Sequence, residues 1–310
     1  TYQTVLETNL VEDPNWSSRI TLGLGKTALA LNQPDIAIAA LQEASQADPN
    51  NPQIPCTLAE AYYTAGLLED ALQTARIGLG LALEDLDVLV WFAEKATQWV
   101  GNSRRIGDGF SPDTIPSELV NQVQTEALNT LTRALQLAPQ RTDLLIRLGK
   151  IQLLIDDPSA AVESFQKVLA APVASIDDLN LTAENLLALG NPQSAVECLE
   201  RAILQSGHTK SQAFGSSKYA CLAHNLIYAY QQAGNVKNAL STLDEAIALY
   251  PTDVSISNTK AKILLELGRP QEALASLEEA LQGQTDGQNV ADLHKQAASI
   301  YRTSGDLPAA

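Results

Sequence analysis

The fold is decided by residues 226–251, which read LIYAYQQAGNVKNALSTLDEAIALYP. The small and large apolar residues of this stretch recur at the same offsets 34 residues later and again upstream. The glycine and alanine that mark one unit, Gly234 and Ala239, correspond to Gly268 and Ala273, to Gly190 and Ala195, and to Gly66 and Ala71. A fixed period of this length is typical of solenoids, in which each unit packs on its neighbours. A solenoid offers few closed pockets, so the repeat also lowers the expectation of catalysis.

Each unit contains two apolar stripes at helical spacing, which indicates two amphipathic helices. Small residues in the first helix would let the second helix pack closely, and these are Gly25, Ala59, Gly149, Ala183, Ala261 and Ala298. The alanines that open the second helices would do the same, and these are Ala37, Ala71, Ala127, Ala161, Ala195, Ala239 and Ala273. Glycines between the two helices suit the left-handed conformation that ends a helix, at Gly66, Gly190, Gly234, Gly268 and Gly305.

This spacing resembles the tetratricopeptide repeat (TPR), and the resemblance covers nearly the whole chain. The large aromatic residue near the start of the first helix is mostly replaced, for example by Leu145 or Leu179, so the repeats are degenerate. The resemblance implies an all-α, right-handed α-solenoid of tetratricopeptide-like helix-turn-helix repeats. We expect residues 1–310 to form a single TPR solenoid. The pattern opens and closes inside a repeat, which indicates a fragment of a longer chain.

The period predicts units that begin near residues 17, 51, 85, 141, 175, 219, 253 and 290. Two insertions interrupt it, at about 101–118 and 207–219. The first is rich in glycine, proline and serine, and it is predicted to be a loop, either a tolerated insertion or a contact for a partner. The second either lengthens a helix or forms a loop, and we favour a first helix that starts early, near Ser216.

Composition bounds the function. The net charge of −16 argues against nucleic-acid binding, and it either keeps the surface soluble or attracts a basic partner. No apolar run approaches the roughly 20 residues that span a bilayer, so no membrane association is expected. The three cysteines and three histidines have no ligand spacing, and no catalytic set stands out. We therefore predict a non-enzymatic cytoplasmic protein with no cofactor and no metal.

In the resembled family, the first helices line the concave face of the superhelix. The stripe that would face inward carries asparagines and cations, which suit the backbone and the carboxylates of a peptide. These candidate groove residues are Arg147, Lys150, Asn180, His224, Asn225, Tyr228, Asn258, Lys262 and Lys295. The stripe of the first units carries fewer asparagines and cations, with Thr57 and Trp91 among its residues, so binding is predicted in the C-terminal half. The alternative is that these are ordinary solvated polar residues.

The predicted function is therefore a protein–protein interaction scaffold that binds a peptide or protein segment in the concave groove. One alternative is a regulatory or structural TPR arm of a larger enzyme, with catalysis outside this fragment. A further alternative is a homodimer through uncapped terminal helices. Segment 2–13 would be a second helix without its first, and segment 291–304 a first helix without its second. Their apolar stripes would then be exposed, at Val5, Leu6 and Leu10 and at Leu293, Ala297, Ile300 and Tyr301.

Overall fold

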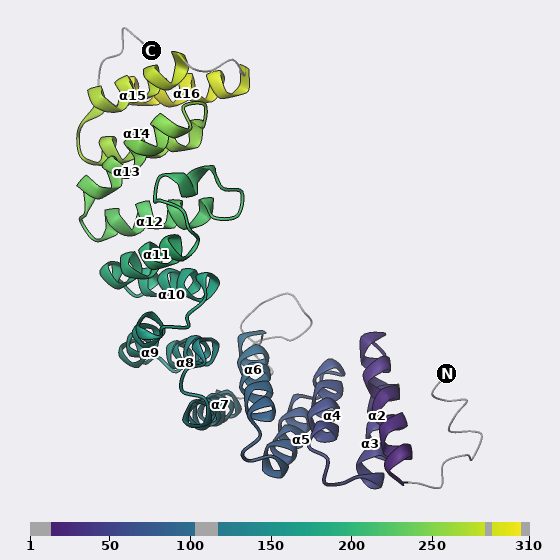
Figure 1. Cartoon of the computed structure of the whole chain (residues 1–310). Coiled ribbons are helices and arrows are strands. Elements are labelled where there is room, and N and C mark those ends of the chain that lie inside the picture. Colours follow the sequence, from purple (N-terminus) through teal and green to yellow (C-terminus); the bar gives the residue numbers. More distant parts are fainter. Residues whose placement is uncertain (1–13, 103–116, 283–286, 305–310) are drawn as a thin grey trace. The chain divides into compact units, whose positions relative to one another are not determined.

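The computed structural model describes residues 14–102, 117–282 and 287–304. Within these ranges the chain forms helices joined by short turns and contains no β-strand (Figure 1). It divides into two compact units, residues 1–161 and residues 162–310, and the division falls inside the helix α9. Each unit is a stack of helix pairs, so the predicted all-α helix-turn-helix repeat fold is confirmed. The prediction of a single domain over residues 1–310 stays a prediction.

The helices of the first unit are α2 (Pro14–Ala30), α3 (Pro34–Ala47), α4 (Gln53–Thr64), α5 (Leu68–Leu81), α6 (Leu86–Asn102), α7 (Ser117–Leu137), α8 (Thr142–Leu154) and the start of α9 (Pro158–Ala170). The second unit continues with α10 (Ile176–Ala188), α11 (Pro192–Gln205), the 3₁₀-helix η2 (Gln212–Gly215), α12 (Ala220–Gln232), α13 (Val236–Leu249), α14 (Val254–Glu266), α15 (Pro270–Gln282) and α16 (Gly287–Ser304).

First and second helices alternate along the chain. A first helix packs on its own second helix, as α2 does on α3 and α4 on α5, and the second helix packs on the next first helix, as α3 does on α4. Consecutive first helices also contact each other, α2 with α4 and α4 with α6. The first helices α2, α4, α6, α8, α10, α12, α14 and α16 begin within a few residues of the predicted unit boundaries.

The alanines predicted to open the second helices are all buried, although Ala127 lies in the middle of α7 and not at its start. Ala37, Ala71, Ala161, Ala195, Ala239 and Ala273 are 0% exposed and Ala127 is 1% exposed. On the first helix of the first pair, a Cβ built on Gly25 would lie 2.5 Å from Cγ of Leu41 on α3, so only glycine allows this approach. One small-residue assignment is wrong, because Ala298 is exposed and Ala297, one position earlier, is buried.

The turns within the helix pairs share one hydrogen-bond pattern. In the turn after α12, Gly234 has a φ of 72°, and the amide of Asn235 donates to the carbonyl of Tyr230. This is the Schellman arrangement, which satisfies carbonyls left over at the helix end. The predicted glycines with positive φ are confirmed at Gly66, Gly190, Gly234 and Gly268, and Asn32 and Asp156 take the same place in two other turns. Gly305 lies outside the described residues.

The insertion at 207–219 folds differently from the favoured prediction. Helix α12 begins at Ala220 and not near Ser216, whose backbone is extended. The residues before it form η2, whose last residue, Gly215, lies so close to Tyr250 that a Cβ would meet the ring at 2.2 Å. The Tyr250 hydroxyl also donates to the carbonyl of Gln212 at 3.2 Å. These contacts hold the segment as a compact loop.

The other predicted insertion, at 101–118, is only partly described. Its ends belong to α6 and α7, and residues 103–116 lie outside the described residues.

A three-residue cluster ties the same insertion to its neighbours. The ammonium of Lys210 forms an ion pair with Glu200 on α11 and donates to the hydroxyl of Tyr230 on α12 at 2.6 Å. The Tyr230 hydroxyl in turn donates to the same Glu200 oxygen. Burial raises the pKa of Glu200, but the hydrogen bonds from Lys210 and Tyr230 outweigh it and hold this pKa below its ordinary value. Burial lowers the pKa of Lys210, and its bonds to Glu200 and Tyr230 raise it by more.

The C-terminal helix corrects one prediction. Leu293, Ala297 and Ile300 on α16 are buried in a core cluster with Ala273 and Leu277 of α15, and Tyr301 packs against the same cluster. The prediction that this stripe is exposed is therefore wrong, because α16 lies on α15 in the way that α12 lies on α11 and α14 on α13. The corresponding N-terminal stripe at Val5, Leu6 and Leu10 lies outside the described residues.

Enlarging a buried alanine tests the close packing of the helix pairs. Ala239→Leu should lower the free energy of unfolding by about 1–3 kcal/mol, because the added atoms have no space between α12 and α13. The matched control is Ala248→Leu, on the exposed face of the same helix, which should leave the thermal midpoint nearly unchanged. Equal melting temperatures for the two variants would contradict the packing described above.

The cluster around Lys210 should make stability depend on pH. Glu200 has a lowered pKa, so its contribution is present above its unfolded pKa of about 4.3 and is lost as the pH falls through the lower folded value. Lys210 has a raised pKa, so its contribution is lost only as the pH rises above about 10.4. Lys210→Met should therefore cost at most about 1 kcal/mol near neutral pH, since both side chains are over a third exposed.

Denaturant unfolding of this variant and the wild type across a pH series measures the effect, with Lys237→Met on α13 as control. The difference between Lys210→Met and the wild type should shrink at acid and strongly alkaline pH. A constant difference across the series would show that the ion pair does not contribute.

Candidate functional site

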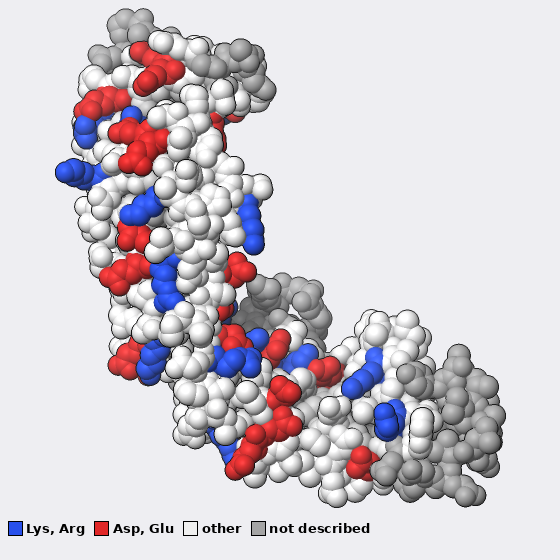
Figure 2. Space-filling model, viewed as in Figure 1, with Lys and Arg blue, Asp and Glu red and all other residues white. Residues whose placement is uncertain are grey.

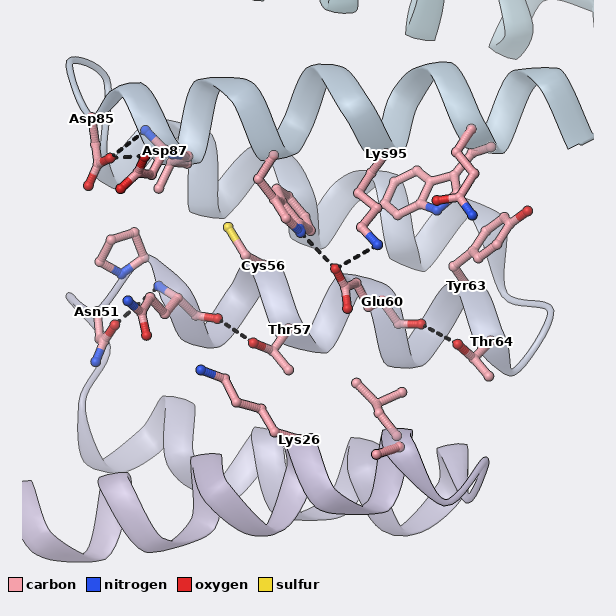
Figure 3. A pocket seen from close by; sticks show the side chains of 18 residues that line it. Lys26, Asn51, Cys56, Thr57, Glu60, Tyr63, Thr64, Asp85, Asp87 and Lys95 are labelled. Atoms are coloured by element: carbon pink, nitrogen blue, oxygen red, sulfur yellow. Dashed lines mark hydrogen bonds and ion pairs between the residues drawn. The ribbon is translucent and has the colours of Figure 1, made fainter. Parts of the chain in front are cut away.

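A cavity of about 890 Å³ lies between the first helices of the first three helix pairs. Helices α2 and α6 form its walls and α4 lies between them (Figure 3). Lys26 and Leu29 come from α2, while Cys56, Thr57 and Glu60 are among the residues from α4. Because consecutive first helices contact each other, their exposed stripes meet in this groove. We refer to it as the N-terminal groove.

The wall formed by α6 has a regular chemical pattern. Asp87, Trp91, Lys95 and Trp99 line the cavity at intervals of four residues, so they lie on one face of the helix. An acid, an aromatic ring, a cation and a second aromatic ring therefore succeed one another along the groove. Each step corresponds to about 6 Å along the helix axis.

Glu60 on α4 connects the two middle members of this wall. Its Oε1 accepts a hydrogen bond from the indole Nε1 of Trp91 at 2.7 Å and lies 3.0 Å from the ammonium of Lys95 (Figure 3). The bond fixes the orientation of the half-buried Trp91 ring, and the ion pair compensates the charges of Glu60 and Lys95. Hydrogen bonds to a charged partner of this kind contribute roughly 1.5–3 kcal/mol.

Aromatic rings form one end of the groove. Tyr63 stacks on Trp99 with ring centroids 5.2 Å apart, and Trp91 meets Trp99 edge to face at 6.4 Å. Trp99 is only 2% exposed and belongs to the core cluster of the first unit. The rings are thus anchored in the core, and they give the groove a rigid apolar surface.

The other end of the groove is acidic. Asp85 caps α6, because its Oδ1 accepts hydrogen bonds from the backbone amides of Asp87 and Val88 at 2.9 and 3.3 Å. Asp85 and Asp87 lie together at this end in Figure 3, away from Tyr63 and Lys95. The start of the helix therefore holds two carboxylates beside the cavity.

Cys56 lies on the α4 side of the groove and is 7% exposed. Burial, reinforced by the negative charges of Glu60 and Asp85, raises the pKa of its thiol to about 12. Cys198 is fully buried, and burial likewise raises the pKa of its thiol to about 12. A thiol with such a pKa is protonated at neutral pH, so Cys56 acts as an apolar surface and not as a nucleophile.

Several predicted groove residues bond to one another in the second unit. Asn225 on α12 donates to Oδ1 of Asn180 on α10 at 3.0 Å, and Asn180 donates to Glu184 at 3.0 Å. Asn258 and Lys295 line a separate cleft of about 290 Å³ between α14 and α16. Within the described residues, Oδ1 of Asn258 is buried without a hydrogen-bond partner. The structure thus brings the predicted residues together in two small groups.

The remaining predicted residues lie apart. Arg147 on α8 forms an ion pair with Glu94 at 3.6 Å, and Lys150 is half-buried on the same helix. The ring of His224 packs edge to face against Phe214 of η2, with centroids 5.0 Å apart. Two further residues are exposed, Tyr228 on α12 and Lys262 on α14. None of the nine predicted residues lines the N-terminal groove.

The sequence pattern does not predict the N-terminal groove, although it places Thr57 and Trp91 on the inward stripe. The number of polar residues on the stripe favours the C-terminal half, and Asp87, Lys95 and Trp99 are not among the predicted groove residues. The four-residue spacing of Asp87, Trp91, Lys95 and Trp99 was the available signal. Two of the three tryptophans of the chain fall on this one stripe.

No group of three or more histidine, cysteine, aspartate or glutamate side chains that could hold a metal ion occurs within residues 14–102, 117–282 and 287–304. In the same ranges, no helix is both long and apolar enough to cross a membrane.

Comparison with known proteins agrees with the architecture. A tetratricopeptide repeat family model matches residues 28–79 and 230–297. A chain in the structure of Naa15/Naa10 bound to HypK-THB is 16% identical, with a TM-score of 0.51 over 92% of this chain and 39% of that chain. A thermophilic TPR protein of Thermus thermophilus is 20% identical, with a TM-score of 0.41 over 66% of this chain and 98% of that chain. No curated protein sequence matches. At these identities the similarity shows the fold alone.

Thiol labelling tests the surroundings of Cys56. At pH 7.5 a maleimide should label Cys221 rapidly, because this thiol is exposed, while Cys56 and Cys198 should react only after unfolding. Peptide mapping by mass spectrometry identifies the labelled residue, and Cys221→Ser should remove the rapid reaction. Rapid labelling of Cys56 in the folded protein would contradict its burial on the α4 side of the N-terminal groove.

Proposed function

Because this chain is built of tetratricopeptide repeats, we propose that it is a non-catalytic scaffold that binds an extended segment of another protein in the N-terminal groove. The observation that carries the proposal is the cavity of about 890 Å³ between α2, α4 and α6. Its lining joins anchored aromatic rings to a few fixed polar groups, which is the composition typical of binding sites. The Naa15/Naa10 chain, which shares the fold, is part of a complex of several proteins.

The dimensions of the groove favour an extended ligand. Asp87 and Trp99 lie twelve residues apart on α6, which corresponds to about 18 Å along the helix. An extended peptide of five or six residues covers this length at about 3.3 Å per residue. The Trp91 and Trp99 rings are already held by core packing and by Glu60, so they lose little conformational freedom when a ligand binds. The entropic cost of binding therefore comes mainly from ordering the ligand.

The polar residues of the second unit form a second candidate contact region. The buried Oδ1 of Asn258 lacks a partner in the described part of the chain, and Lys295 beside it can bind an oxygen of a ligand. The bonded set of Asn180, Glu184 and Asn225 has already satisfied part of its hydrogen-bonding capacity. We therefore place the principal site in the N-terminal groove. The alternative, that the repeats are the arm of a larger enzyme, is compatible with the same binding surface.

Obstructing the groove tests the proposal. Peptides are selected from a phage-displayed library of random 12-residue sequences, synthesised with a fluorescent label and titrated with the protein by anisotropy. Thr57→Arg places a long side chain in the groove and should weaken their binding at least about tenfold, since it occupies the ligand's volume. Gln73→Arg, on the exposed surface of α5, is the matched control and should leave the affinity unchanged.

Circular dichroism confirms that both variants fold. Unchanged affinity in Thr57→Arg would place the site elsewhere, and loss of binding in a double Asn225→Ala and Lys262→Ala variant would move it to the second unit. If the library yields no peptide that binds the wild type, the proposed function is wrong.

A further inference from the structure

The chemistry of the N-terminal groove changes along its length, and this change bears on the class of ligand. Asp85 and Asp87 lie at the start of α6, while Trp91, Trp99 and Tyr63 follow further along. The acidic end and the aromatic surface belong to one continuous cavity. A single bound segment would therefore meet both.

Within the described residues, the carboxylates of Asp85 and Asp87 form no ion pair with the basic residues near them. Lys95 is paired with Glu60, 3.0 Å away, on the far side of Trp91. Arg141, at the start of α8, forms two hydrogen bonds of 2.8 Å with Asp143. Its charge also interacts with that of Asp87, but more weakly than with Asp143. Lys26 extends from the opposite wall below Thr57, and it is separated from Asp85 and Asp87 in Figure 3.

The amides at the start of α6 occupy only one oxygen of Asp85, by hydrogen bonds of 2.9 and 3.3 Å. Asp85 and the exposed Asp87 both line the cavity. Carboxylates in this position attract a cationic group from a ligand. The acidic side chains do not form one continuous patch on the face shown in Figure 2, where Asp and Glu are interspersed with Lys and Arg. The attraction of a cationic group therefore depends on the local arrangement of Asp85 and Asp87, and not on the net charge.

The spacing along α6 matches that of an extended chain. Asp87 and Trp91 are four residues apart, or about 6 Å along the helix. Two residues of an extended peptide advance about 6.6 Å, and their side chains point to the same side. A ligand residue beside Asp87 and the residue two positions away would therefore reach the acidic end and the Trp91 ring at the same time.

We propose that the N-terminal groove recognises a basic–x–apolar segment, in which a lysine or arginine lies two positions from an aromatic or large aliphatic residue. The cation binds beside Asp85 and Asp87, and the apolar side chain packs on Trp91, whose ring is held by Glu60. This inference rests on the proposed function and specifies its ligand. The net charge of −16 would add a general attraction that speeds the approach of such a segment.

A pair of synthetic peptides tests the charge preference. Both are labelled nine-residue peptides with a glycine–serine background, and they carry lysine–serine–tryptophan or glutamate–serine–tryptophan at the centre. Anisotropy titration of the wild type should show at least tenfold tighter binding of the lysine peptide. Replacing its tryptophan by serine should also weaken binding at least tenfold, because the contact with Trp91 is lost.

The protein variants assign the preference to the groove. Asp87→Lys should abolish or reverse the preference for lysine, whereas Glu84→Lys, an equal change of charge at an exposed residue outside the cavity, should retain it. Asp87→Asn serves as a second variant in case a lysine in the first turn of α6 destabilises the helix, and it should reduce the preference. Thermal melts compare the stability of all three.

The outcomes separate this inference from the proposed function. If both peptides bind equally and Thr57→Arg blocks both, the groove binds peptides without regard to charge and the inference is overturned alone. It is also overturned if Asp87→Lys leaves the preference intact, or if neither peptide binds while library-selected peptides do. If neither these nor any library-selected peptides bind the wild type, both are overturned.

Discussion

The close contact between the two helices of each pair is the constraint on which the rest of the structure depends. Alanine at positions such as Ala37 and Ala239, and glycine at Gly25 against Leu41, remove the side-chain volume that would separate the helices. Within the first unit, each pair then presents its first helix in the same way, and α4 contacts both α2 and α6. The N-terminal groove exists because α2, α4 and α6 are placed side by side by this packing.

The features that were predictable from the sequence are those set within one unit. Glycine with positive φ at Gly234, burial at Ala239 and the start of α14 near residue 253 each follow from short-range patterns. The groove was not predictable in this way, because Glu60 and Trp91 meet only after two units have stacked. The insertion before α12 is predicted at 207–219, but its conformation is not, since it depends on the ring of Tyr250.

Polar groups at the two candidate surfaces are used in different ways. In the N-terminal groove, Glu60 binds Trp91 and Lys95 and so holds an apolar ring towards open space. In the second unit, Asn180 and Asn225 bind each other, so a ligand would have to compete with an existing hydrogen bond. A count of polar residues on a stripe does not separate these cases, because it ignores what each side chain already contacts.

The hydrogen bond between Trp91 and Glu60 has an optical consequence. Of the three tryptophans, Trp91 lies in the groove, Trp99 lies beneath its aromatic end, and Trp16 is 57% exposed on α2. Indole emission depends on the polarity around the ring and on nearby charges. Displacement of water from Trp91 by a bound segment would shift its emission to shorter wavelength, while Trp16 would supply a constant background. The groove therefore carries an intrinsic fluorophore through which its occupancy can be followed without a label.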